Sequence, residues 1–148
     1  MKKKLFKKLS FTLLEMLVVI GIVGILIGMG AVSYSTAQKK ARDAKRKQDL
    51  KAIQNAFEQY YSICNYRYPN SVPPGGSDLV ATTTNCPSLS SNVTIFTMPK
   101  DPLGGNYTCN GICDVSRYTI CSPQVSGSSR LETQNCTSGN ECCVSNKQ

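Results

Sequence analysis

A long uncharged apolar segment lies near the start of the chain, and an amphipathic segment follows it. Residues 16–37 carry no charged side chain, and about 20 apolar residues are enough for a helix to span a bilayer. No proline or glycine interrupts residues 31–68. Within that stretch, apolar residues recur at steps of three or four, the spacing of one helical face. They are Leu50, Ile53, Phe57, Tyr60 or Tyr61, and Cys64. The pattern predicts one helix over residues 11–63, about 80 Å long, whose first half crosses the membrane.

Short strand-like runs separated by turn residues follow this helix. Asp101-Pro102 and Gly104-Gly105 predict turns, and the polar residues 81–92 predict a loop. Strands are predicted at residues 93–98, 107–109, 115–121 and 130–133. The expected fold class is α+β: a long N-terminal helix, transmembrane in its first half, packed on a small antiparallel β-sheet in a disulfide-stapled C-terminal region.

All eight cysteines lie beyond the apolar segment. An even number in a short, loop-rich segment predicts a disulfide framework, which persists only outside the reducing cytosol. Its connectivity is left open, although adjacent cysteines rarely meet disulfide geometry and should bond to different partners. The alternative is a cysteine-only zinc site, but no second pair matches the Cys109-x-x-x-Cys113 spacing. The disulfide candidates are Cys64, Cys86, Cys109, Cys113, Cys121, Cys136, Cys142 and Cys143.

The net charge of +8 is concentrated in two patches that flank the apolar segment. Five lysines lie in residues 1–10, and seven lysines and arginines lie in residues 39–51, here called the basic neck. This confinement favours a membrane protein over direct nucleic-acid binding. Because both flanks are basic, the positive-inside rule does not decide orientation; the cysteines place the C-terminal part outside. The neck could contact anionic headgroups or acidic neighbours, or it could be a solvated helical face.

Several function classes are disfavoured by the residues that are missing. The chain has no histidine, which removes Ser-His-Asp and Cys-His catalysis, and no convincing acid pair is present. The chain is therefore not expected to be an enzyme.

An ordinary secretory signal peptide, cut after Ala37, is another interpretation of the apolar segment. Its apolar region would be only about 7–15 residues long, and the glutamate at position 15 would be out of place.

Residues 10–20 read Ser-Phe-Thr-Leu-Leu-Glu-Met-Leu-Val-Val-Ile behind the lysine-rich leader. This sequence resembles the N-terminal signature of type IV pilins and type II secretion pseudopilins. The resemblance implies that prepilin peptidase cuts between Ser10 and Phe11 and methylates the Phe11 amine. It also implies that Glu15 pairs with the Phe11 amine of a neighbouring subunit. The family usually has glycine where Ser10 stands, which leaves the efficiency of cleavage open.

Glu15 can also be interpreted without the resemblance. A carboxylate within a bilayer costs a few kcal/mol, so it should be paired or functional. The alternative is that Glu15 simply lies at headgroup level.

Gly24 and Gly28 form a Gly-x-x-x-Gly spacing. This spacing would allow close helix packing or local melting of the helix, although glycine is common in membrane helices anyway.

Two further segments resemble the major pseudopilins of type II secretion. Residues 66–69 are similar to their Arg-Tyr-Pro segment, and residues 98–104 to their Pro-x-Asp-Pro-Trp-Gly segment, with Leu103 in place of the aromatic residue. Those proteins bind calcium in a following loop, but the expected Ser-x-Gly-x-Asp-Gly is absent here. Asp101 and Asp114 are only weak calcium candidates, so no cofactor is expected, and the extra cysteines could hold the loop instead.

The sequence thus predicts a structural subunit of a type IV pilus or type II secretion pseudopilus. The expected partners are further copies, other pilins or pseudopilins, prepilin peptidase, an inner-membrane assembly platform and the cytoplasmic membrane. The chain would cross that membrane once, with its C-terminal domain outside, before it enters an extracytoplasmic filament. The alternative is a membrane-anchored, disulfide-rich extracellular binding module. The expected domains are a basic leader (1–10), a transmembrane and assembly helix (11–37), an extracytoplasmic amphipathic helix (38–63) and a small Cys-rich α+β pilin-like domain (64–148).

Overall fold

The computed structural model describes residues 11–125, 128–129, 131–132 and 142–146. The chain divides into two compact units, Met1–Gln38 and Lys39–Gln148. The long helix contributes to both units, and every described strand belongs to the second.

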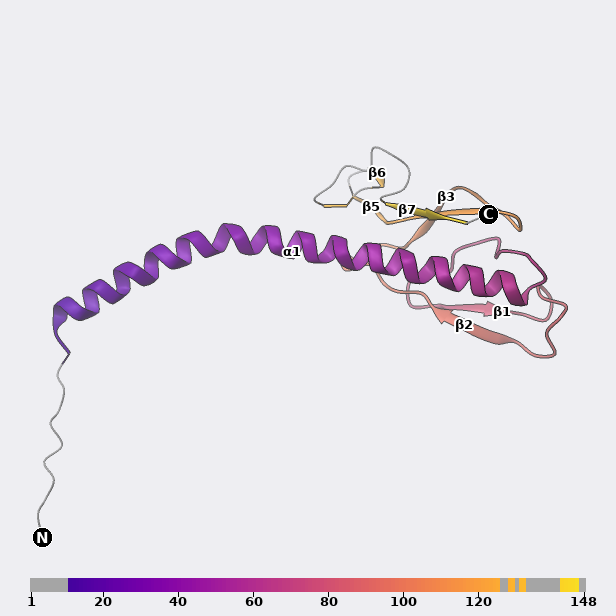
Figure 1. Cartoon of the computed structure of the whole chain (residues 1–148), viewed down its shortest axis with the longest axis horizontal. Helices are drawn as coiled ribbons and strands as arrows, with labels where there is room; N and C mark the ends of the chain where they lie inside the picture. Colours follow the sequence, from indigo (N-terminus) through magenta and orange to yellow (C-terminus); the bar gives the residue numbers. More distant parts are fainter. Residues whose placement is uncertain (1–10, 126–127, 130, 133–141, 147–148) are drawn as a thin grey trace, which may run out of the picture. The chain divides into compact units, whose positions relative to one another are not determined.

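The helix α1 runs from Leu13 to Ile63 (Figure 1), which confirms the predicted helix with a start two residues later. The helix ends where the backbone adopts a left-handed conformation. Asn65 and Tyr66 adopt positive φ angles of 54° and 60°, and the Tyr66 N–H donates to the Tyr61 carbonyl at 3.0 Å. Left-handed residues after the last turn satisfy carbonyls that the helix itself leaves open, and asparagine tolerates this conformation better than most residues.

The α1 segment within the first unit presents apolar side chains on all sides. Its described large apolar residues, from Phe11 to Met29, are exposed, with Leu13 at 83% and Met29 at 74%. By length and composition α1 could cross a membrane. A helix that is apolar all round needs either lipid or other helices around it.

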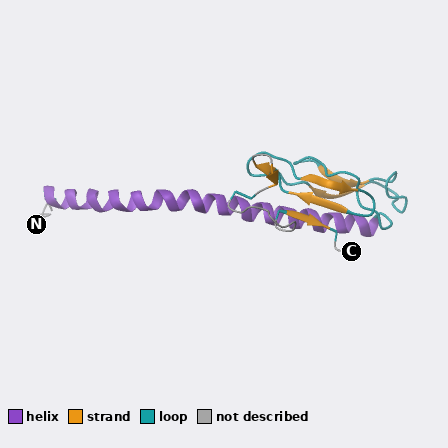
Figure 2. Ribbon diagram, turned by 90° about the horizontal axis from the view of Figure 1, so that it is seen from above, coloured by secondary structure: helices purple, strands orange, loops and turns teal. Residues whose placement is uncertain are grey.

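The described strands form three small antiparallel sheets rather than the single sheet expected from the sequence. In the view of Figure 1, the β1–β2 pair and the three-stranded sheet lie to either side of the second half of α1, and Figure 2 shows the strands gathered along that half. The first pair is β1 (Asp78–Ala81) with β2 (Val93–Thr97). The three-stranded sheet has the order β3-β4-β7, with β3 at Thr108–Cys113, β4 at Tyr118–Cys121 and β7 at Cys143–Ser145. The second pair is β5 (Gln124–Val125) with β6 (Ser128–Ser129).

The strand predictions hold in part. The strand predicted over 93–98 is β2, and those over 107–109 and 115–121 correspond to β3 and β4. The last of these begins later than predicted, because the Asp114 carboxylate accepts the N–H groups of Ser116 and Arg117 at 2.8 and 2.9 Å and closes a turn there. The strand over 130–133 is wrong at its described positions, since Leu131 and Glu132 are not in a strand. The sequence prediction missed β1, β5, β6 and β7, which have four residues or fewer.

The core of the second unit lies between α1 and the strands. The predicted helical face is confirmed: Leu50, Ile53, Phe57, Tyr60 and Cys64 are buried, and Tyr61 is half-buried. Aromatic rings extend this face toward the strands. Tyr118 of β4 lies 5.0 Å from Phe57 and 4.8 Å from Tyr68 between ring centroids. Such tilted and edge-on pairs stabilise a core beyond the area they bury.

Candidate assembly site and the basic neck

The start of α1 is a reciprocal cap formed by Thr12 and Glu15. The Glu15 N–H donates to the Thr12 hydroxyl oxygen at 3.2 Å, while Glu15 Oε2 accepts the Thr12 N–H and hydroxyl, both at 3.0 Å. This is the capping box that Thr-x-x-Glu sequences form at helix N-termini. Sequence reasoning missed this cap, although the spacing of Thr12 and Glu15 is its signature. Of the predicted processing pair, Phe11 is 73% exposed and Ser10 lies outside the described residues.

The Glu15 carboxylate remains accessible to a further partner. Its hydrogen bonds to Thr12 all end on Oε2, and the side chain is exposed. No described residue donates a hydrogen bond to Oε1. One carboxylate oxygen can therefore hold the cap while the other receives a cation from another molecule.

Gly24 and Gly28 are open within this chain. No heavy atom outside the helix's own backbone lies within 4 Å of the position that a Cβ would take at either residue. Their role in close helix packing stays a prediction, because such packing would involve helices of other molecules.

The basic neck contains a buried ion-pair cluster centred on Arg46. The Arg46 guanidinium makes two hydrogen bonds to the Asp101 carboxylate, at 2.6 and 3.0 Å, and both side chains are almost completely buried. Its Nη1 also lies 3.6 Å from Asp43 and 3.8 Å from Glu132. Arg46 lies four residues before Leu50 and seven before Ile53, on the same helical face. That spacing is the sequence signal that could have placed it in the core.

Two further carboxylates bind neighbouring segments to the neck. The Arg42 guanidinium makes two hydrogen bonds to Glu132, both at 2.6 Å, and the Glu132 N–H donates to Asp43 at 2.8 Å. Asp49 accepts the Tyr107 hydroxyl at 2.8 Å and pairs with Lys45 at 2.9 Å. We call Arg42, Asp43, Arg46, Asp101 and Glu132 the neck cluster; it joins α1 to the segment after β2 and to the segment after β6.

The titration of these carboxylates follows from their contacts. Burial would raise the pKa of Asp101, but hydrogen bonds from Arg46 and from the N–H groups of Leu103 and Gly105 outweigh it, so the pKa lies below its ordinary 3.8. The hydrogen bond from Arg42 lowers the pKa of Glu132 below its ordinary 4.5. Both groups are therefore ionised at neutral pH, as their cationic partners require.

The two weak calcium candidates are engaged by other residues of the chain. Asp101 is engaged by Arg46, and Asp114 by Ser116 and Arg117. Among the described residues there is no group of three or more acidic, cysteine or histidine side chains that could hold a metal ion. Calcium needs six to eight oxygens, and these two carboxylates instead serve an ion pair and a turn.

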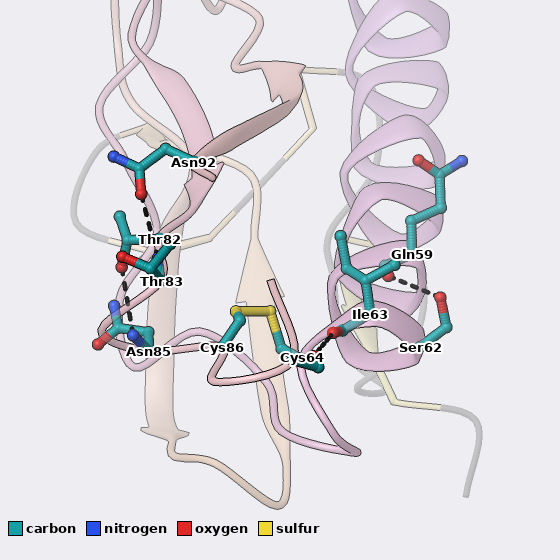
Figure 3. The surroundings of a disulfide bond; sticks show 10 residues. Gln59, Ser62, Ile63, Cys64, Thr82, Thr83, Asn85, Cys86 and Asn92 are labelled. Carbon is teal, nitrogen blue, oxygen red and sulfur yellow. Dashed lines mark hydrogen bonds between the residues drawn. A yellow bond between two sulfur atoms is a disulfide. The ribbon is translucent and has the colours of Figure 1, made fainter. Parts of the chain in front are cut away.

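The cysteines form a disulfide framework, as the sequence predicted. The Cys64–Cys86 bond joins the C-terminal end of α1 to the turn that follows β1 (Figure 3), Cys109–Cys113 closes a loop within β3, and Cys121–Cys143 joins β4 to β7. Because Cys109 and Cys113 bond to each other, the zinc alternative is wrong. Cys142 is also disulfide-bonded, so the adjacent Cys142 and Cys143 have different partners. Cys136 lies outside the described residues.

A long apolar N-terminal helix, capped at a Thr-x-x-Glu start and leading into a disulfide-bonded α+β unit, defines the class of pilin-like proteins. The sequence comparisons agree. The prokaryotic N-terminal methylation motif matches residues 6–31, and the family "Type II secretion system (T2SS), protein G" matches residues 33–139. The chain therefore belongs to the type II secretion system protein G family.

Individual relatives carry the same family name. The type II secretion system core protein G of Escherichia coli (strain K12) is 34% identical over 68% of this chain and 70% of its own length. The protein of that name from Vibrio cholerae is 35% identical over 71% of this chain and 72% of its own length, and that from Aeromonas hydrophila is 36% identical over 66% and 69%. No solved structure gives a significant match.

Proposed function

We propose that this chain is a structural subunit of a type II secretion pseudopilus and that it assembles through the start of α1. The observation that carries the proposal is the exposed Thr12–Glu15 cap at the head of α1, whose described large apolar residues up to Met29 are exposed, in a chain of the protein G family. The family is one of structural pseudopilins, and the role of this chain in it is mechanical.

Assembly would begin with a cut between Ser10 and Phe11 and methylation of the new amine. The Phe11 amine of one subunit would then meet Glu15 Oε1 of its neighbour. This contact removes two charges from the apolar surroundings, and it fixes the axial stagger between subunits because only one register brings the groups together. Successive head-to-tail contacts of this kind generate an open helical filament.

The apolar surface of α1 supports the same assembly. Each subunit would wait in the cytoplasmic membrane as a single-pass protein, with its disulfide-bonded unit on the outer, oxidising side. Bundling would transfer the apolar face from lipid to neighbouring helices, with Gly24 and Gly28 as points of close approach. Further copies, other pseudopilins, prepilin peptidase and an inner-membrane assembly platform are the partners that this route requires.

The pairing role of Glu15 can be separated from its capping role by two variants. Glu15→Gln keeps an oxygen that accepts the Thr12 N–H but removes the charge, whereas Thr12→Val removes the hydroxyl of the cap but keeps the charge. We expect Glu15→Gln to lower the yield of sheared filaments by at least about tenfold, because the neighbour's amine is left uncompensated. Thr12→Val should assemble within about twofold of the wild type, since a cap contributes only about 1 kcal/mol to a helix this long.

The membrane level of each variant, measured by immunoblot, controls for insertion and turnover. Equal losses in the two variants would mean that Glu15 acts only as a cap, and the proposed pairing would be wrong. Unchanged assembly in both would show that filaments form without this pairing, and the proposed role of Glu15 would again be wrong.

A further inference from the structure

The cations of the basic neck differ in their surroundings. Arg42 pairs with Glu132, Lys45 with Asp49, and Arg46 with Asp101. The other four are lysines with exposed side chains, namely Lys39, Lys40, Lys47 and Lys51. The sequence alone predicted one basic patch of seven cations. In the structure, these four lysines are the candidates for contact with an external anion.

The lysines are arranged along one side of α1. Lys40, Lys47 and Lys51 are separated by steps of seven and four residues, which place them on one helical face. The buried face of the same turns carries Asp43, Arg46 and Leu50 instead. Lys39 is adjacent to Lys40 in the chain, so two exposed cations follow the uncharged segment 16–37 within three residues of its end.

A second copy of this chain offers these lysines little negative charge. The seven described carboxylates of the Lys39–Gln148 unit all have partners within the chain. Five have cationic partners, namely Asp43, Asp49, Asp101, Asp114 and Glu132. Glu58 accepts the Tyr68 and Tyr118 hydroxyls, Asp78 accepts the Thr97 hydroxyl, and Asp114 accepts Ser116 and Arg117. A neighbouring subunit offers few accessible acceptors, because Asp43, Asp49 and Asp101 are buried and only Asp78 among these seven is classed as exposed.

We propose that Lys39 and Lys40 dock the neck onto anionic phospholipid headgroups of the leaflet that faces the Lys39–Gln148 unit. The proposal relies on the proposed function only in placing α1 across the membrane. The lysines immediately follow the spanning segment, and their charge is opposite to that of an anionic lipid surface. At a rise of 1.5 Å per residue, Lys47 and Lys51 lie about 10 and 16 Å farther along α1 than Lys40.

This geometry predicts a graded response to the lipid surface. Electrostatic attraction decays over about 8 Å at physiological ionic strength, so Lys51 lies roughly two decay lengths beyond Lys40. Lys39 and Lys40 should therefore dominate, and Lys51 should contribute little. The contact would hold a waiting subunit in the membrane and would have to be released when that subunit enters the filament.

The test compares matched double variants of the full chain, reconstituted in phosphatidylcholine vesicles. Electron paramagnetic resonance with spin-labelled phosphatidylglycerol and spin-labelled phosphatidylcholine measures the preference of the protein for the anionic lipid. The variants Lys39→Gln/Lys40→Gln and Lys47→Gln/Lys51→Gln remove the same charge from exposed positions. All samples carry the same leader lysines, so the contribution of the leader cancels in the comparison.

We expect Lys39→Gln/Lys40→Gln to lower the preference for phosphatidylglycerol by at least about twofold. The largest possible reduction is about fivefold for each lysine removed, because one lysine near an anionic surface contributes at most about 1 kcal/mol. Lys47→Gln/Lys51→Gln should lower it less, and salt at about 1 M should abolish the difference. Equal reductions in the two variants, or none in either, would overturn the proposal. The vesicles contain no assembly machinery, so this result does not depend on whether filaments form, and failure of the Glu15 experiment would leave it standing.

Discussion

At the scale of single residues, Arg46 stands out because a fully buried cation is costly. Withdrawing a guanidinium and a carboxylate from water costs several kcal/mol per ion, and their attraction repays this only with good geometry. Here the two hydrogen bonds to Asp101 supply that geometry. We infer that the Arg46–Asp101 pair determines the position at which the segment after β2 packs on α1, and that it contributes little net stability.

Removing one partner of this pair should therefore be far more harmful than its net contribution suggests. Arg46→Met leaves Asp101 buried without a cation, and we expect the free energy of unfolding to fall by about 3–5 kcal/mol. Denaturant unfolding of the detergent-solubilised chain, followed by circular dichroism, measures the loss. Lys45→Gln is the matched control: its cation is about half exposed, so removing it should cost no more than about 1 kcal/mol. Similar losses for the two variants would contradict the assignment of Arg46 to the core.

The lowered pKa values of Asp101 and Glu132 predict acid sensitivity. A carboxyl whose pKa is lower in the folded state stabilises the fold above its unfolded pKa, and that contribution is lost as the pH falls through the folded pKa. The ordinary values are 3.8 for Asp101 and 4.5 for Glu132. The contribution of these two groups should be constant from neutral pH down to about pH 5 and should decline below pH 4.5.

Unfolding free energies measured across this pH range check the acid prediction. Arg46→Met should flatten the decline, because it removes the cation that lowers the pKa of Asp101. A decline of equal steepness in wild type and variant would assign the acid sensitivity to other carboxylates.

At the scale of elements, the end of α1 depends on a covalent tie. Its last residues carry the core face, and the Cys64–Cys86 bond anchors them across 22 residues. Closing a loop of this length in the unfolded chain stabilises the fold by about 2–4 kcal/mol.

Cys64→Ala/Cys86→Ala should therefore lower the free energy of unfolding by about that amount. Cys109→Ala/Cys113→Ala is the matched control, because it removes a bond that spans only four residues and should cost roughly half as much. Thermal or denaturant unfolding of both variants gives the comparison. A larger loss from the shorter loop would show that loop length does not govern the effect.

The helix could be predicted from the sequence because its signal is long and local. Leu50, Ile53 and Phe57 repeat at helical spacing, and no glycine or proline interrupts them. The strands β1 and β7 could not be predicted, since runs of four and three residues carry little periodicity. Nor could the Arg46–Asp101 pair, because its members lie 55 residues apart and nothing local couples them. Asp101 was instead a weak calcium candidate, since a carboxylate looks the same in sequence whichever cation it serves.

At the scale of the whole molecule, the chain combines a helix whose described large apolar residues up to Met29 are exposed with a unit whose described carboxylates all have partners within the chain. The first feature requires other helices or lipid around it, while the second limits ion pairing between copies. Register in a filament would then depend on the contact of Glu15 with the Phe11 amine. That contact exists only if the leader is removed at one position.

The most direct test of this account is the mass of the mature N-terminus. Intact-mass and N-terminal peptide mass spectrometry should be carried out on the protein isolated from its native membrane. The account predicts a chain that begins at Phe11 and carries one N-methyl group. A chain that begins at Met1 would contradict it and indicate an anchored protein, and a chain that begins at Gln38 would contradict it and indicate a secreted one.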